Sequence, residues 1–120
     1  MARSAVTVTE LSAYNTAATI TKDAIDTSNN HSIDVSGLSD ERMQIYFDVT
    51  TAPCTIEIKS GDYEDSVLGD LTITSTGVEV NVVEIETSRF KDSDELILID
   101  VSSTGSGAGT IYATANVQAK

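Results

Sequence analysis

The sequence predicts an all-β fold: a single-domain antiparallel β-sandwich, or a partly open barrel, of about seven or eight strands. Short segments in which apolar and polar residues alternate recur along most of the chain, and clusters of Gly, Ser, Asn and Asp separate them. The length of 120 residues suits one domain. We expect residues 1–11 to form an N-terminal arm or edge strand and residues 12–120 to form the sandwich.

The N-terminal segment Ala2–Leu11 alternates weakly between valine and threonine. This pattern fits an edge strand, or an arm that becomes ordered on a partner. The next segment, Ser12–Asn30, has few large aliphatic residues, so we expect a loop with short pieces of strand. A short strand is predicted over residues 33–35.

The clearest alternation lies in Met43–Lys59, where two runs meet at Thr51-Ala52-Pro53. Every second residue of each run is apolar, which is typical of half-buried strands. Pro53 has no N–H to donate and suits a connection better than a strand. The segment therefore predicts a β-hairpin whose apolar side needs a second layer to cover it.

A second hairpin is predicted from Leu71–Thr74 and the run of Val78, Val80 and Val82, because a short Gly-containing link separates them. The adjacent Val83 breaks the alternation, which indicates a β-bulge or a bend at this point.

Later segments complete the predicted sandwich. Thr87–Phe90 is expected to be a turn with its aromatic ring directed inward. Leu96–Ile99 is apolar on both faces, which indicates an interior strand or one whose outer face meets a partner. Ser102–Gly109 is rich in Gly and Ser and predicts a mobile hairpin loop. The last strand is Thr110–Gln118, with Ile111, Ala113, Ala115 and Val117 facing inward.

Composition argues against several classes of function. The net charge of -12 disfavours binding to nucleic acid or anionic membranes, since phosphate groups are attracted by Lys and Arg. No apolar window is long enough for a spanning helix or a signal peptide, so synthesis in a cytoplasm is expected. The only cysteine, Cys54, has no disulfide partner and lies on the apolar side of a predicted strand, where it is expected to pack.

The residues do not form a recognisable catalytic set. His31 is the only histidine, and the Asn and Ser residues beside it predict an exposed turn with no nucleophile nearby. The acidic segments Asp62–Asp65 and Asp92–Glu95 could supply oxygen ligands to Ca²⁺, but neither matches an EF-hand loop, and we interpret them as solvated loops. The glycines of 105–109 precede no helix or lysine, so phosphate binding is not expected there. We predict a protein that is not an enzyme and that holds no metal or cofactor.

Tyrosines are the remaining candidates for recognition. Tyr46 and Tyr112 point away from the predicted core and could serve as interface anchors, because tyrosine buries a large area at low entropic cost. The same rings could stack on sugars, so a carbohydrate-binding or adhesin-like module on a virion or cell surface is the alternative function. The candidate interface residues are Val6, Val8, Leu11, Tyr14, Tyr46 and Tyr112.

Several segments resemble a family of short proteins encoded beside the major capsid protein of tailed bacteriophages, which decorate the phage head. These segments span most of the chain and comprise Ala5–Thr9, Ile56–Asp62, Leu68–Leu71, Glu86–Phe90 and the following Asp94. The resemblance implies a non-enzymatic β-domain, also described as a capsid cement protein, that binds the outer surface of a capsid and stabilises it. It also implies the major capsid protein as partner and a homo-oligomer, with a trimer as the expected form.

Overall fold

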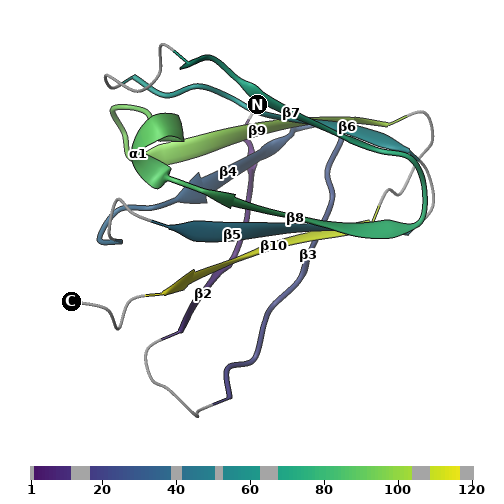
Figure 1. Ribbon diagram of the computed structural model, residues 1–120, viewed down its shortest axis with the longest axis horizontal. Coiled ribbons are helices and arrows are strands. Elements are labelled where there is room, and N and C mark those ends of the chain that lie inside the picture. Colours follow the sequence, from purple (N-terminus) through teal and green to yellow (C-terminus); the bar gives the residue numbers. More distant parts are fainter. Residues whose placement is uncertain are drawn as a thin grey trace.

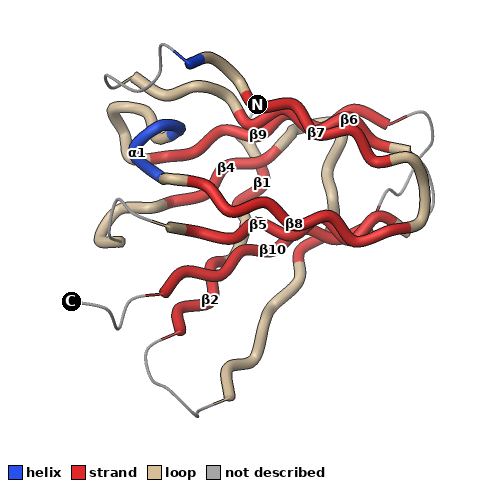
Figure 2. Tube along the Cα trace, in the orientation of Figure 1, coloured by secondary structure: helices blue, strands red, loops and turns tan. Residues whose placement is uncertain are grey.

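The computed structural model describes residues 2–11, 17–38, 42–50, 53–62, 68–103 and 109–116. Strands dominate this part of the chain, and one short helix interrupts them (Figure 2). The elements in chain order are β1 (Ser4–Ala5), β2 (Val8–Leu11), β3 (Asp23–Ala24), β4 (His31–Asp34), β5 (Met43–Val49), β6 (Cys54–Ile58), β7 (Leu71–Ser75), β8 (Glu79–Ile85), α1 (Thr87–Phe90), β9 (Leu96–Ser103) and β10 (Gly109–Asn116).

The strands form two layers, which confirms the predicted β-sandwich (Figure 1). Sheet A has the strand order β1-β4-β9-β6-β7, and sheet B has the order β2-β10-β5-β8 with β3 also paired to β10. The described residues form ten strands, more than expected, because β1 and β3 are pieces of two residues. Most pairs are antiparallel, but β1 pairs with β4 and β2 pairs with β10 in parallel, so both sheets are mixed.

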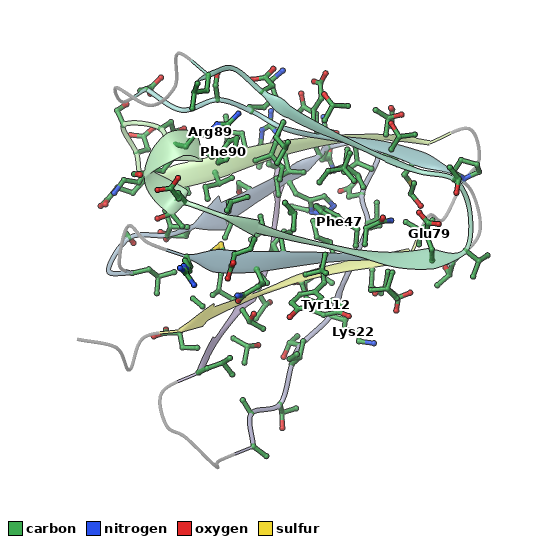
Figure 3. All side chains as sticks on the ribbon, in the orientation of Figure 1. Lys22, Phe47, Glu79, Arg89, Phe90 and Tyr112 are labelled. Atoms are coloured by element: carbon green, nitrogen blue, oxygen red, sulfur yellow. The ribbon has the colours of Figure 1, made fainter. Side chains whose placement is uncertain are left out.

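The core lies between the two sheets and is built from the alternating apolar positions. In β5, every second residue from Met43 to Val49 is buried, and β6 follows the same rule from Cys54 to Ile58. Phe47 points from β5 into the space between the layers (Figure 3). The largest fully buried apolar side chains are Phe47, Ile33, Met43, Ile45, Ile56, Ile58, Ile97, Ile99, Ile111 and Val49.

The hairpin predicted over Met43–Lys59 is wrong, although both of its strands exist. β5 pairs with β8 and β10 in sheet B, whereas β6 pairs with β7 and β9 in sheet A. The chain crosses from one layer to the other between Val49 and Cys54. This arrangement lets the two apolar rows face each other across the core, while a hairpin would have left both on one layer.

The second predicted hairpin is wrong for the same reason. β7 is the edge strand of sheet A and β8 is the edge strand of sheet B, and a short link joins them across the sandwich (Figure 1). The predicted bulge is also absent from β8. Its register with β5 runs without a slip from Met43 opposite Ile85 to Val49 opposite Glu79. Consequently Val83 and Ile85 face the core side, and Val80 and Val82 face outward.

Other predicted elements agree with the structure. β9 lies in the middle of sheet A, with Ile97 and Ile99 buried in the core and Leu98 half-buried on the outer face. The turn predicted at Thr87–Phe90 is one turn of helix, and its Phe90 is buried as expected. The exception is the hairpin predicted across Ser102–Gly109, which is wrong because β9 belongs to sheet A and β10 to sheet B. β9 also continues to Ser103 and β10 begins at Gly109, so both ends of the predicted loop are strand. Val117 lies outside the described residues.

The N-terminal segment joins the two sheets on the side opposite β7 and β8. β1 lies at the edge of sheet A and β2 at the edge of sheet B, with Val6 buried between them in the core. Arg3 forms an ion pair of 2.8 Å with Asp100, and the Ser4 hydroxyl donates a hydrogen bond of 2.6 Å to Asp26 Oδ2. In this monomer the segment is therefore an integral part of both sheets.

Candidate binding surface

The outer face of sheet B carries two tyrosines side by side. Tyr112 on β10 pairs directly with Tyr46 on β5, and both point away from the core because of the period-2 alternation. Their rings are stacked, with centroids 4.9 Å apart and an angle of 9° between the ring planes. On its other side Tyr46 has Val82 of β8 as cross-strand neighbour. We call Tyr46 and Tyr112 the tyrosine pair. An aliphatic side chain, Val82, lies next to this pair in the same cross-strand row.

Lys22 covers the tyrosine pair at one end. Its ammonium group lies 5.4 Å from the centroid of the Tyr112 ring, a cation–π contact, and 3.8 Å from Asp48 Oδ2 (Figure 3). Tyr112 is only 8% exposed as a result of these neighbours. Both faces of the Tyr112 ring are therefore occupied by protein groups, and only Tyr46, which is half-buried, has ring surface left for stacking on a sugar.

A row of exposed valines continues this face to the edge of sheet B. Val78 is 77% exposed, and Val80 and Val82 are each 58% exposed. These three residues, which we call the valine row, occupy every second position of the segment that leads into and forms β8. A cluster of large apolar side chains on an exposed sheet face is uncommon in a monomer and marks a surface for association.

The valine row ends at a polar boundary. Gln44 donates a hydrogen bond of 2.6 Å from Nε2 to Glu84 Oε2, and it accepts one of 3.0 Å from the Thr114 hydroxyl. These three side chains form the next cross-strand row on β10, β5 and β8. Since they satisfy one another, they form a polar rim beside the apolar part of the face, exposed at Glu84 and buried at Thr114.

The structure brings together only part of the predicted interface set. Tyr46 and Tyr112 are adjacent, as described above. Val6 belongs to the core and is removed from the candidate surface, whereas Val8 is half-buried and Leu11 is exposed. Tyr14 lies outside the described residues.

The valine row was not among the predicted interface residues, because these valines were interpreted only as one strand of a hairpin. The sequence does contain a sign of this surface, because the apolar residues change from even to odd positions at Val82 and Val83. Such a change is explained either by a bulge or by outward-facing valines followed by inward-facing Val83 and Ile85. The structure has the second one.

His31 is buried, so the predicted exposed turn is wrong at this residue. Its Nε2 accepts a hydrogen bond of 2.8 Å from the Asp26 backbone N–H, and its Nδ1 lies 3.2 Å from the Ser4 carbonyl oxygen, to which it donates. This pattern corresponds to the neutral ring with the proton on Nδ1. Burial lowers the pKa of His31, while the contact with Ser4 opposes that shift. The imidazole joins β1 and the Asp26 turn to β4.

Two carboxylates of the acidic segments, those of Asp62 and Asp92, accept hydrogen bonds from backbone N–H groups. Asp62 Oδ2 accepts a hydrogen bond of 2.9 Å from the Ser93 N–H, which ties the two predicted acidic segments together. Asp92 Oδ1 accepts hydrogen bonds from the backbone N–H groups of Asp94 and Leu96. Within the described ranges, no group of three or more His, Cys, Asp or Glu side chains is arranged to hold a metal ion. The described chain also contains no helix long and apolar enough to cross a membrane.

Comparison with protein-family models, with curated proteins and with solved structures finds no match.

Proposed function

We propose that this chain is a structural virion protein that binds the outer surface of a phage capsid and stabilises it, without catalysing a reaction. Its partner is the major capsid protein, and the protein acts as a homo-oligomer. It is made in the host cytoplasm and resides on the virion. The resemblance of its strand segments to phage head decoration proteins supports this class of function.

The observation that carries the proposal is the apolar outer face of sheet B. The valine row and the tyrosine pair lie together on a protein whose net charge is -12. Covering an exposed valine contributes on the order of 1 kcal/mol. One such face alone should bind the capsid with only modest affinity. Several faces in one oligomer bind more tightly, because the first contact raises the effective concentration of the others.

The charge is consistent with this location. Packaged DNA would repel an acidic protein, so the outside of the shell is the more favourable side. The carbohydrate-binding alternative has less support, because the two tyrosine rings stack on each other and Lys22 covers one of them.

Co-sedimentation with undecorated heads of the same phage tests the proposal. Wild-type protein at micromolar concentration is expected to sediment with the heads. Val82→Asp, on the outer face of sheet B, should lose at least tenfold in affinity. Thr55→Asp adds the same charge at an exposed position on the outer face of sheet A and should bind like wild type. Absence of wild-type binding, together with a specific hit on a glycan array, would favour the carbohydrate-binding alternative.

A further inference from the structure

The outward edge of β8 has no partner strand among the described residues. In the strand order of sheet B, β8 lies at one end and pairs only with β5. Alternate residues of an edge strand direct their N–H and C=O groups outward, where they can pair with another strand. Proteins usually protect such edges with charged side chains, above all lysine, with proline or with a bulge. β8 contains neither lysine nor proline, its register with β5 has no bulge, and its only charged residues are Glu79 and Glu84.

The sequence at this edge is symmetric about Val80. The segment Val78-Glu79-Val80-Asn81-Val82 has valine at its centre and at both ends, with one polar residue on each side of the centre. When such a segment pairs antiparallel with a copy of itself, Val80 lies opposite the partner's Val80. Val78 then lies opposite the partner's Val82, and the reciprocal pair follows by symmetry.

We infer that β8 pairs antiparallel with β8 of a second copy of this chain, about a two-fold axis at Val80. The pairing joins two four-stranded paths into one continuous eight-stranded sheet. It also places the two valine rows side by side on the outer face, where they contact laterally and form one larger apolar surface. Directly opposed aliphatic pairs of this kind stabilise antiparallel strands.

Charge complementarity favours this occupant. Glu79 lies opposite the partner's Asn81, so each carboxylate faces an amide donor, and no two carboxylates are directly opposed. The same two side chains already interact within one copy, where Asn81 Nδ2 donates a hydrogen bond of 3.2 Å to Glu79 Oε2. The other acidic residue of β8, Glu84, lies beyond the paired segment Val78–Val82, so it opposes no carboxylate of the partner.

The inference differs from the trimer that the family resemblance implies. A two-fold strand pairing is closed after two copies, because both β8 edges are then occupied. It also does not depend on the proposed capsid function, since the purified protein alone is sufficient to test it.

Molar mass in solution tests the pairing. Sedimentation equilibrium should give twice the chain mass of 12.7 kDa at high concentration, with dissociation on dilution. Val80→Lys places two lysines opposite each other at the axis and should weaken dimerisation at least tenfold. Thr72→Lys introduces lysine at an exposed position of the other edge strand, β7, and should dimerise like wild type. A monomer at all concentrations, a trimer, or equal effects of the two lysines would overturn the inference.

Cysteine substitution tests the register. In Val80→Cys the two thiols face each other across the axis, at a separation that a disulfide between opposed strand residues can span. Mild oxidation should therefore give a covalent dimer. In Val82→Cys the two thiols lie about 13 Å apart along the strands, so no disulfide should form. Cys54 is buried on the inner side of β6 and does not compete. Equal crosslinking of the two variants would contradict the register centred on Val80.

Discussion

The backbone N–H of Asp26 donates a hydrogen bond of 2.8 Å to Nε2 of His31, a ring that is fully buried beneath β1. The bond requires a neutral imidazole, since a protonated Nε2 cannot accept. The second ring nitrogen donates to the Ser4 carbonyl, so one side chain connects three segments of the chain. We call Ser4, Asp26 and His31 the polar cluster. Because it requires a neutral His31, the attachment of the N-terminal segment to the rest of the fold depends on pH.

Acid should destabilise the fold in two steps. Burial lowers the pKa of His31 below its usual 6.5, so the unfolded state binds more protons as pH falls through that value. The free energy of unfolding should therefore decrease from about pH 7 downward, until the folded-state pKa is passed. A second decrease is expected below about pH 4, chiefly because the Ser4 hydroxyl lowers the pKa of Asp26 to about 2.

Urea unfolding between pH 7.5 and pH 3 measures both steps. His31→Gln retains a neutral acceptor and should lose the first step while keeping the second. A first step of the same size in this variant would show that another group titrates there.

Gly109 should tolerate no side chain. Its φ of 139° lies in a region that disfavours residues with a Cβ, and an added Cβ would overlap the Asp48 carbonyl oxygen on β5. We expect Gly109→Ala to lower the melting temperature strongly, by disturbing the β5–β10 pairing. Gly37→Ala is the matched control, because Gly37 also has positive φ but no atom lies within 4 Å of the added Cβ. Equal melting temperatures for the two variants would contradict the close approach.

The middle of sheet A should be a centre of stability. Ile97 and Ile99 on β9 are fully buried, and truncation of such side chains to alanine costs about 2–5 kcal/mol. Thr72 is exposed on the edge strand β7, where Thr72→Ala should change the free energy of unfolding by no more than about 0.5 kcal/mol. Chemical denaturation of the three variants compares these values. Similar losses in all three would mean that β9 is not in the core.

An N-terminal arm could be deleted without unfolding the domain, but the N-terminal segment forms edge strands of both sheets and should be required for folding. Deleting residues 2–10 removes β1, most of β2 and the buried Val6, and should abolish cooperative thermal unfolding. Val6→Ala should destabilise more than Leu11→Ala, because Leu11 is exposed at the end of β2. A deletion variant with a wild-type melting curve would restore the arm interpretation.

These outcomes show how much local pattern could predict. Alternation located β5, β6, β7 and β10 and the core-facing positions within them, because a period of two depends only on neighbouring residues. It could not identify partners. β5 pairs with β8 and β10, which are distant in sequence, and consecutive strands cross between the sheets in all three places where a hairpin was predicted.

The candidate surface illustrates the same limit. Outward positions of Tyr46 and Tyr112 followed from alternation within each strand, but their stacking depends on the register between β5 and β10. The face of the valine row depends on which of two parities β8 adopts, and only the pairing with β5 decides this. The burial of His31 results from β1 and the Asp26 turn, neither of which is encoded beside the histidine.

A binding isotherm on undecorated heads at low and high NaCl tests most directly whether apolar contact attaches the protein to the shell. Many copies at a charge of -12 repel one another, and salt screens this repulsion over about 8–10 Å. If the outer face of sheet B makes the contact, affinity should be unchanged or higher at high salt. A tenfold or greater loss of affinity at high salt would contradict this account and indicate that the acidic segments Asp62–Asp65 and Asp92–Glu95 dock on a basic patch of the capsid.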